Sequence, residues 1–175
     1  LVVLLLGELT GGWTNGAFFS VYRASFTDPL SYVRLFGHVL GHSSLAHYTS
    51  NIMLLLVIGP MLEEKYGASL MVSMMAVTAA VSGILHCIVS SSTMLLGASG
   101  IVFMLILLAS FSGVDGKTIP LTLILVAAVY LGQEIYAGMF ADDNVSHFKN
   151  IVGGLCGAAF GFLLGRRHRR PEAMA

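Results

Sequence analysis

Charged residues are scarce in this chain of 175 residues, because Asp, Glu, Lys and Arg together make up only 10% of it. None of the four occurs from residue 66 to residue 114, a run of 49 residues. Soluble domains carry about 25% charged residues, so this composition could not cover a water-facing surface. Hydrophobic residues supply 56% of the chain. The sequence therefore indicates an integral membrane protein.

Cysteines and clustered basic residues are also few. The two cysteines, Cys87 and Cys156, fall on separate apolar segments without the spacing of a metal site, so we expect both to be small packing residues. The basic residues form no face suited to nucleic acid, since the largest group, within residues 166–170, directly follows an apolar run and is typical of a topology anchor. We expect no nucleic-acid partner and no cofactor.

The apolar runs predict the fold class. They fall near residues 1–9, 46–62, 68–90, 96–112, 118–138 and 146–165. One membrane crossing takes about 20 helical residues, so we predict an all-α membrane protein, a bundle of six transmembrane helices in a single domain over residues 1–175. The first run is too short to cross, and we expect the chain to begin inside its first helix, which is thus truncated.

Basic residues predict the orientation in the bilayer. The arginines of residues 166–175 indicate a cytoplasmic tail by the positive-inside rule. Counting back through six crossings places residues 10–45 on the outer side, with the starts of the fourth and sixth helices. The 10–45 segment holds Trp13 and several other aromatics. It is too polar to cross, and we expect it to fold at the membrane interface as an outer loop.

A polar tetrapeptide, Gly97-Ala98-Ser99-Gly100, stands inside the charge-free run. Flanking glycines let another backbone approach closely, and a serine at a helix N-terminus lies beside backbone N–H groups that can stabilise an oxyanion. Small-residue runs of this kind also serve simple helix packing in membranes. The pattern alone leaves both roles for Ser99 open.

His47 and Asn51 stand four residues apart and share one helix face. Polar side chains are costly in lipid, so both should point into the bundle, where they would form interhelical hydrogen bonds or donate to a substrate oxyanion. A metal site built from His38, His42, His47 and His86 is a weaker hypothesis, because the first three do not share one helical face. We expect no bound metal.

The last apolar run carries glycines at residues 153, 157, 161 and 165, one on each successive turn of the same helix face. Such a stripe is a close-packing surface in membranes. A polar residue one turn above it could reach side chains of the neighbouring helix, and His147 and Asn150 are the candidates.

Taken together, these features resemble the rhomboid intramembrane serine proteases over about residues 32–165. The matching motifs, in order, are Val33-Arg34-Leu35-Phe36, His38, His42, His47, Asn51, Gly59, Glu63, Gly67, the GxSG motif at 97–100 and the glycine stripe. The resemblance implies that Ser99 is the nucleophile of a Ser–His dyad in a water-filled cavity, with His47, Asn51 and the Ser99 N–H as the oxyanion hole. The resemblance also places Gly97 and Phe103 among the oxyanion and substrate-binding residues. Phe103 stands where many relatives carry a tyrosine that packs on the catalytic histidine.

The dyad histidine admits two registers. In relatives it usually stands three residues before the first glycine of the stripe, and counted from Gly153 that position is Asn150, whose amide cannot accept the serine proton. In the second register the stripe is counted from Gly154, and Asn150 replaces its first glycine. His147 then takes the position of the dyad histidine, and Ala158 stands where a glycine is expected. The first register fits the glycines better, and the second supplies a base.

We predict a rhomboid-type serine endopeptidase that cleaves single-span membrane proteins, with Ser99 attacking and His147 as general base and then acid. Its expected location is the bacterial plasma membrane, with several crossings and a cytoplasmic C-terminus. The alternative, motivated by Asn150, is a non-catalytic rhomboid-fold protein that binds transmembrane helices.

Overall fold

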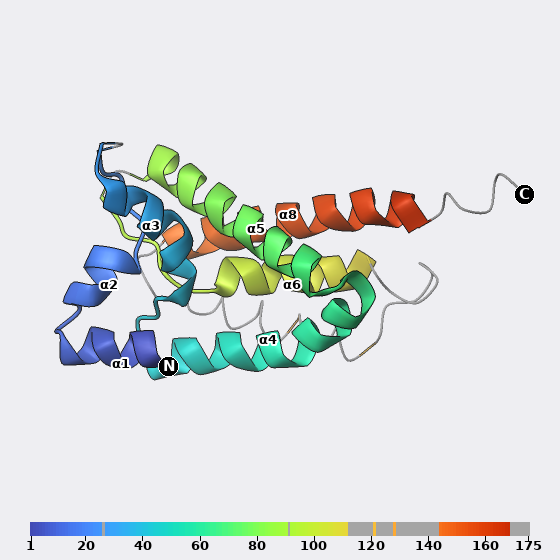
Figure 1. The fold of residues 1–175 in the computed structure, drawn as a ribbon, viewed down its shortest axis with the longest axis horizontal. Helices are drawn as coiled ribbons and strands as arrows, with labels where there is room; N and C mark the ends of the chain where they lie inside the picture. Colours follow the sequence, from blue (N-terminus) through green and yellow to red (C-terminus); the bar gives the residue numbers. More distant parts are fainter. Residues whose placement is uncertain (26, 91, 112–120, 122–127, 129–143, 169–175) are drawn as a thin grey trace, which may run out of the picture.

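The structure is a computed structural model that describes residues 1–25, 27–90, 92–111, 121, 128 and 144–168 (Figure 1). In the last helix, side chains are described from residue 150 to residue 164. The helix predicted over residues 118–138 lies almost wholly outside these ranges. The elements of the described residues are all helices, which confirms the predicted all-α class, and the one β-type contact among these residues is an isolated bridge.

Most of the helices follow the predicted apolar runs, and the others lie within residues 10–45. They are α1 (Val2–Leu9), α2 (Trp13–Phe18), α3 (Pro29–Gly37), the 3-10 turn η1 (His38–Leu40), α4 (Leu45–Tyr66), α5 (Ala68–Val89), α6 (Ser99–Phe111) and α8 (Asn144–His168). Within the described residues, α4 and α5 are long and apolar enough to cross a membrane, and the apolar parts of α6 and α8 are shorter. The number of crossings is therefore a prediction that these helices do not test.

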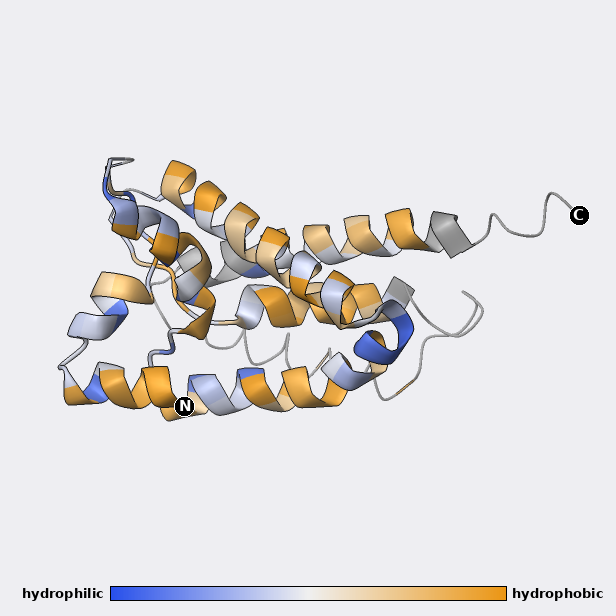
Figure 2. Ribbon diagram, in the orientation of Figure 1, coloured by the Kyte–Doolittle hydropathy of each residue, from blue (hydrophilic) through white to orange (hydrophobic). Residues whose placement is uncertain are grey.

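Large apolar side chains cover the outside of the bundle. On α4, Met53, Leu56 and Val57 are each more than 60% exposed, and Ile88 on α5 is equally open. Figure 2 shows hydrophobic colour along most of α5, whereas the turn from α4 to α5 is hydrophilic. Exposed apolar surface of this extent is costly in water and suits contact with lipid.

Helix α6 forms the centre of the bundle, with α4, α5 and α8 around it (Figure 1). Met104, Leu105 and Leu108 of α6 have no exposed surface. They belong to a core cluster completed by buried residues of α4 and α5, namely Ile58, Leu62, Met71 and Met74. A helix that is apolar on every side, as α6 is, is stable only when neighbours surround it.

A buried arginine organises the outer segment. Arg34 on α3 is 6% exposed, and its Nη1 donates to Asp28 Oδ2 at 2.9 Å. Its Nε donates to the Ala17 carbonyl oxygen of α2 at 2.9 Å, and its Cζ lies 4.7 Å from the centre of the Tyr22 ring. All three contacts are made by the guanidinium group, which therefore links α3 to α2 and to the residues on either side of α2 and α3.

Two sets of hydrogen bonds fasten the outer segment to the bundle. Val21 and Leu95 exchange both N–H···O bonds at 2.9 Å, which fixes the loop before α6. Arg23 donates from Nε to the Cys87 carbonyl at 2.7 Å and from Nη2 to the Ile88 carbonyl at 2.6 Å. A cation at a helix C-terminus satisfies carbonyls that have no partner within the helix and is favoured by the helix dipole.

The ion pair of Asp28 predicts a pH dependence of stability. The Leu30 N–H, and after it the Arg34 guanidinium, hold the pKa of the Asp28 carboxyl below its ordinary value of 3.8. The carboxylate therefore contributes stability above its unfolded pKa, and that stability is lost as the pH falls through the lowered folded pKa. We expect the Tm in detergent to fall below about pH 4, and to fall less in Asp28→Asn, since Asn still caps α3 but carries no charge.

The control is Asp28→Ala, which removes the cap as well and should lower the Tm at neutral pH too. If the Tm of Asp28→Asn fell with pH as much as that of the unmodified chain, the loss of stability in acid would not come from the Asp28 charge.

Candidate functional site

Ser99 lies at the start of α6, held by a turn that only glycine adopts easily. Gly97 has φ of 112°, in the region that disfavours side chains, and its N–H donates to the His38 carbonyl at 2.8 Å. Ala98 accepts the first α6 hydrogen bond, from Val102 N at 2.9 Å. Ser99 thus comes to the N-terminal end of the helix, beside N–H groups that have no partner within the helix.

The Ser99 hydroxyl is enclosed. Its side chain has no exposed surface, and its Oγ makes no hydrogen bond in the described part of the chain. A buried hydroxyl without a partner costs roughly 1–3 kcal/mol. A buried serine hydroxyl that weakens stability is compatible with a functional role.

The glycine stripe of α8 brings its backbone against α6. A Cβ added at Gly153 would lie 2.0 Å from the Gly100 carbonyl oxygen, and one added at Gly157 would lie 2.3 Å from the Met104 carbonyl oxygen. No real Cβ comes that near, so the two helices can lie this close only because both positions are glycine. The predicted packing role of the stripe is confirmed at these two residues.

This contact follows the first of the two registers. Gly153 and Gly157 face α6 backbone, whereas a Cβ at Gly154 would meet side-chain atoms, the nearest being Phe103 Cδ1 at 3.0 Å. Asn150 stands one turn above Gly153 and is 5% exposed. The α8 residue one turn above the Gly153–Gly100 contact is therefore an asparagine.

The position of the other α8 candidate, His147, relative to Ser99 is not described. His147 belongs to α8, but its side chain lies outside the described residues, so its role as a base stays a prediction. Phe103, expected beside a catalytic histidine, faces Gly154 of α8.

On the opposite side of the site, α4 carries the two predicted donors. Ser44 caps α4 by accepting a hydrogen bond from His47 N at 3.1 Å. Asn51 is 1% exposed and His47 is half-buried. His47 Nδ1 lies 3.2 Å from Ser43 Oγ, a contact that the sequence analysis missed although the i, i+4 spacing of Ser43 and His47 signals it.

The remaining histidines are engaged with backbone carbonyls. His38 Nδ1 lies 3.0 Å from the Leu35 carbonyl, His42 Nδ1 lies 3.2 Å from the Leu40 carbonyl, and His86 Nε2 lies 3.0 Å from the Thr93 carbonyl. In the part of the chain that the structure describes, no three His, Cys, Asp or Glu side chains gather as a metal site requires. The geometry gives the metal hypothesis no support.

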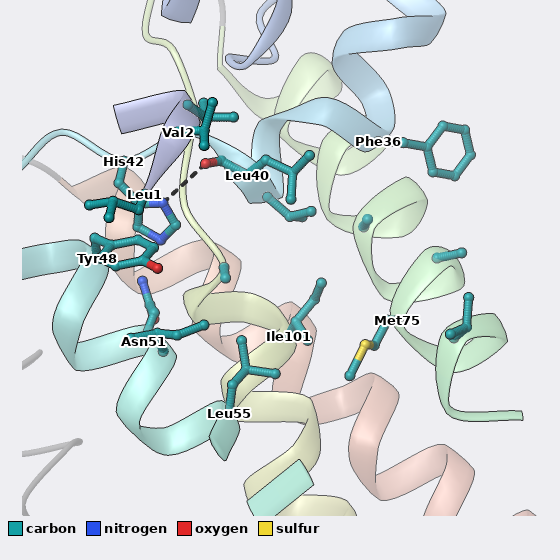
Figure 3. Close-up of a pocket in the computed structure, with 17 residues that line it drawn as sticks. Leu1, Val2, Phe36, Leu40, His42, Tyr48, Asn51, Leu55, Met75 and Ile101 are labelled. Atoms are coloured by element: carbon teal, nitrogen blue, oxygen red, sulfur yellow. Dashed lines mark hydrogen bonds between the residues drawn. The ribbon is translucent and has the colours of Figure 1, made fainter. Parts of the chain in front are cut away.

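A cavity of about 600 Å³ lies behind the Ser99 turn, between α4, α5, η1 and the start of α1 (Figure 3). Its wall is apolar except at His42, Tyr48 and Asn51. Figure 3 shows these three side chains together at one end, with the His42 hydrogen bond to Leu40 above them. Ala98 contributes to the wall and Ser99 does not, so this cavity reaches the donor side of the site without opening onto the hydroxyl.

The stripe predicts a sharp contrast between neighbouring substitutions. Gly153→Ala should destabilise the chain by about 3 kcal/mol, because its Cβ meets backbone that can move only with the whole of α6. Gly154→Ala should cost less than about 1.5 kcal/mol, because the Phe103 ring can shift. Thermal unfolding in detergent measures both, and equal losses would show that α8 does not approach α6 at Gly153.

The enclosed hydroxyl predicts that removing it stabilises the protein. Ser99→Ala should raise the free energy of unfolding by about 1 kcal/mol, since it deletes a buried group without a hydrogen bond. The matched control on the same helix is Ser110→Ala, which loses the hydrogen bond from Ser110 Oγ to the Ile106 carbonyl at 2.9 Å and should not gain stability. A lower Tm for Ser99→Ala would mean that the hydroxyl has a partner in the membrane.

Comparison with known proteins agrees with the motifs and the helix packing. A family model described as the Rhomboid domain matches residues 29–167, which include the Ser99 turn, both α4 donors and the glycine stripe. A search of curated proteins finds no match. With the match spanning most of the chain, the protein belongs to the rhomboid family.

Proposed function

We propose that this protein is a non-catalytic member of the rhomboid family that binds transmembrane segments of other membrane proteins without cleaving them. The observation that carries the proposal is the contact of Gly153 with the Gly100 carbonyl, because it sets Asn150 one turn above, beside the start of α6. A general base must accept a proton from the serine at near-neutral pH. The asparagine amide does not titrate there, so Ser99 would lack a base.

The rest of the site suits binding. Asn51 and His47 are donors one turn apart on α4, and the N-terminus of α6 adds backbone N–H groups. A membrane helix that is locally unwound presents carbonyl oxygens without partners, which are costly in lipid. Donors held inside the bundle would stabilise such a segment by hydrogen bonds, and no covalent step is needed.

A second candidate is the serine endopeptidase itself, and the intact Gly97-Ala98-Ser99-Gly100 turn favours it. Here Ser99 Oγ attacks the scissile carbonyl carbon while His147 takes the hydroxyl proton. Asn51 and His47 stabilise the oxyanion. His147 then returns the proton to the leaving amine, and water hydrolyses the acyl-enzyme. His147 stands three residues before Asn150, about 4.5 Å along the helix axis, so this route needs a local shift of α8.

For either function we propose six crossings in a bacterial plasma membrane, with residues 10–45 on the outer side and residues 166–175 in the cytoplasm. The two long apolar helices and the family's membrane location support several crossings. The arginines after α8 support the orientation.

The test uses the purified full chain in lipid nanodiscs with a fluorescent single-span segment that carries a glycine-proline pair in its outer half. We expect the chain to bind the segment and leave it uncut, and a serine-directed fluorophosphonate probe not to label Ser99. Asn51→Ala should weaken binding about three- to tenfold through the lost hydrogen bond. Asn150→His should make Ser99 reactive with the probe, and Ser99→Ala in that background should abolish the reaction.

The outcomes separate the two candidates. Cleavage or labelling by the unmodified chain that disappears in His147→Ala would establish the endopeptidase and overturn the binding proposal. A segment that neither binds nor is cut would contradict both.

A further inference from the structure

We propose that Ser43 is a positioning residue that holds His47 in the tautomer with its proton on Nε2, the form in which Nε2 is the hydrogen-bond donor. The inference deepens the proposed function and rests on it, because that function uses His47 to donate to a carbonyl oxygen. Ser43 belongs to none of the motifs that led to the site.

The contact lies at the first turn of α4. Ser43 Oγ is 3.2 Å from His47 Nδ1, and the next residue, Ser44, accepts a hydrogen bond from the backbone N of the same histidine. The His47 ring also packs against the His42 ring, with centres 5.0 Å apart and planes at 70°. Ser44 thus holds the backbone of His47, Ser43 contacts its Nδ1, and the His42 ring packs against its ring.

A hydroxyl differs from the partners of the other histidines. A neutral imidazole has one N–H and one lone pair. The carbonyls facing Nδ1 of His38 and of His42 can only accept, which forces the proton onto Nδ1 in both. The Ser43 hydroxyl can donate, and it is exposed, so water can bind its oxygen while its hydrogen goes to His47 Nδ1.

The tautomer decides what His47 offers to a bound segment. With Ser43 donating to Nδ1, the proton resides on Nε2, and that nitrogen donates as the side-chain amide of Asn51 does one turn below. In the opposite tautomer, Nε2 would present a lone pair, which repels a carbonyl oxygen. A neighbour that selects one ring tautomer is a known way to set the chemistry of a histidine.

The test reads the ring directly, with ¹⁵N-labelled histidine in the full chain in nanodiscs at about pH 8.5, where an unperturbed imidazole is neutral. In the unmodified chain we expect the His47 Nδ1 signal of an unprotonated nitrogen and the Nε2 signal of a protonated one. Ser43→Ala should give a mixture of tautomers, and Ser43→Thr, which keeps the hydroxyl, should restore the original pattern. A proton on Nδ1 in the unmodified chain, or a Ser43→Ala spectrum identical to it, would overturn the inference.

Ser44→Ala is the matched control, because it removes the helix cap and should lower the Tm while leaving the His47 tautomer unchanged. Binding of the single-span segment supplies the second readout, and Ser43→Ala should weaken it about three- to tenfold. If the tautomer responds as expected and the segment does not bind, the proposed function fails and the role of Ser43 stands. If the segment binds and the tautomer does not respond to Ser43→Ala, only the role of Ser43 fails.

Discussion

The backbone contact between α6 and α8 is the constraint on which the site depends. A Cβ at Gly153 would lie 2.0 Å from the Gly100 carbonyl oxygen, and one at Gly157 would lie 2.3 Å from that of Met104. Two contacts one turn apart fix both the rotation and the height of α8 against α6. Because Gly100 directly follows Ser99, the same contacts set Asn150 one turn above the α8 residue that packs against the start of α6.

The enclosure of the site explains why an amide there matters. Ser99 has no exposed surface and Asn150 is 5% exposed, so both side chains are shielded from bulk water. An asparagine stays neutral in such surroundings, whereas a carboxylate or an imidazolium would be expensive to hold at this depth. In the proposed function, hydrogen-bond donors would surround the serine without a group that takes its proton, as a site that holds a peptide backbone without hydrolysing it requires.

Much of the fold could be predicted from the sequence, because the long charge-free runs and the glycine stripe leave few alternatives to packed membrane helices. The details of the outer segment could not. Arg34 could be taken from the sequence for a solvated charge. Its burial depends on the Ala17 carbonyl of α2 and on the Tyr22 ring, which only the tertiary fold brings together. The Asp28-Pro29 pair was a readable start signal for α3. The sequence left the α8 register open because Gly153 and Gly154 are adjacent, and only packing against α6 distinguishes them.

An experimental structure of the chain in lipid would test most directly whether Ser99 lacks a base, because it would show which side chains surround Ser99 Oγ. We predict that Asn150 is the α8 side chain nearest to this hydroxyl and that no imidazole nitrogen lies within hydrogen-bond reach of it. An imidazole nitrogen of His147 about 3 Å from Ser99 Oγ, with Asn150 turned away from it, would contradict the account and give the protein a catalytic dyad.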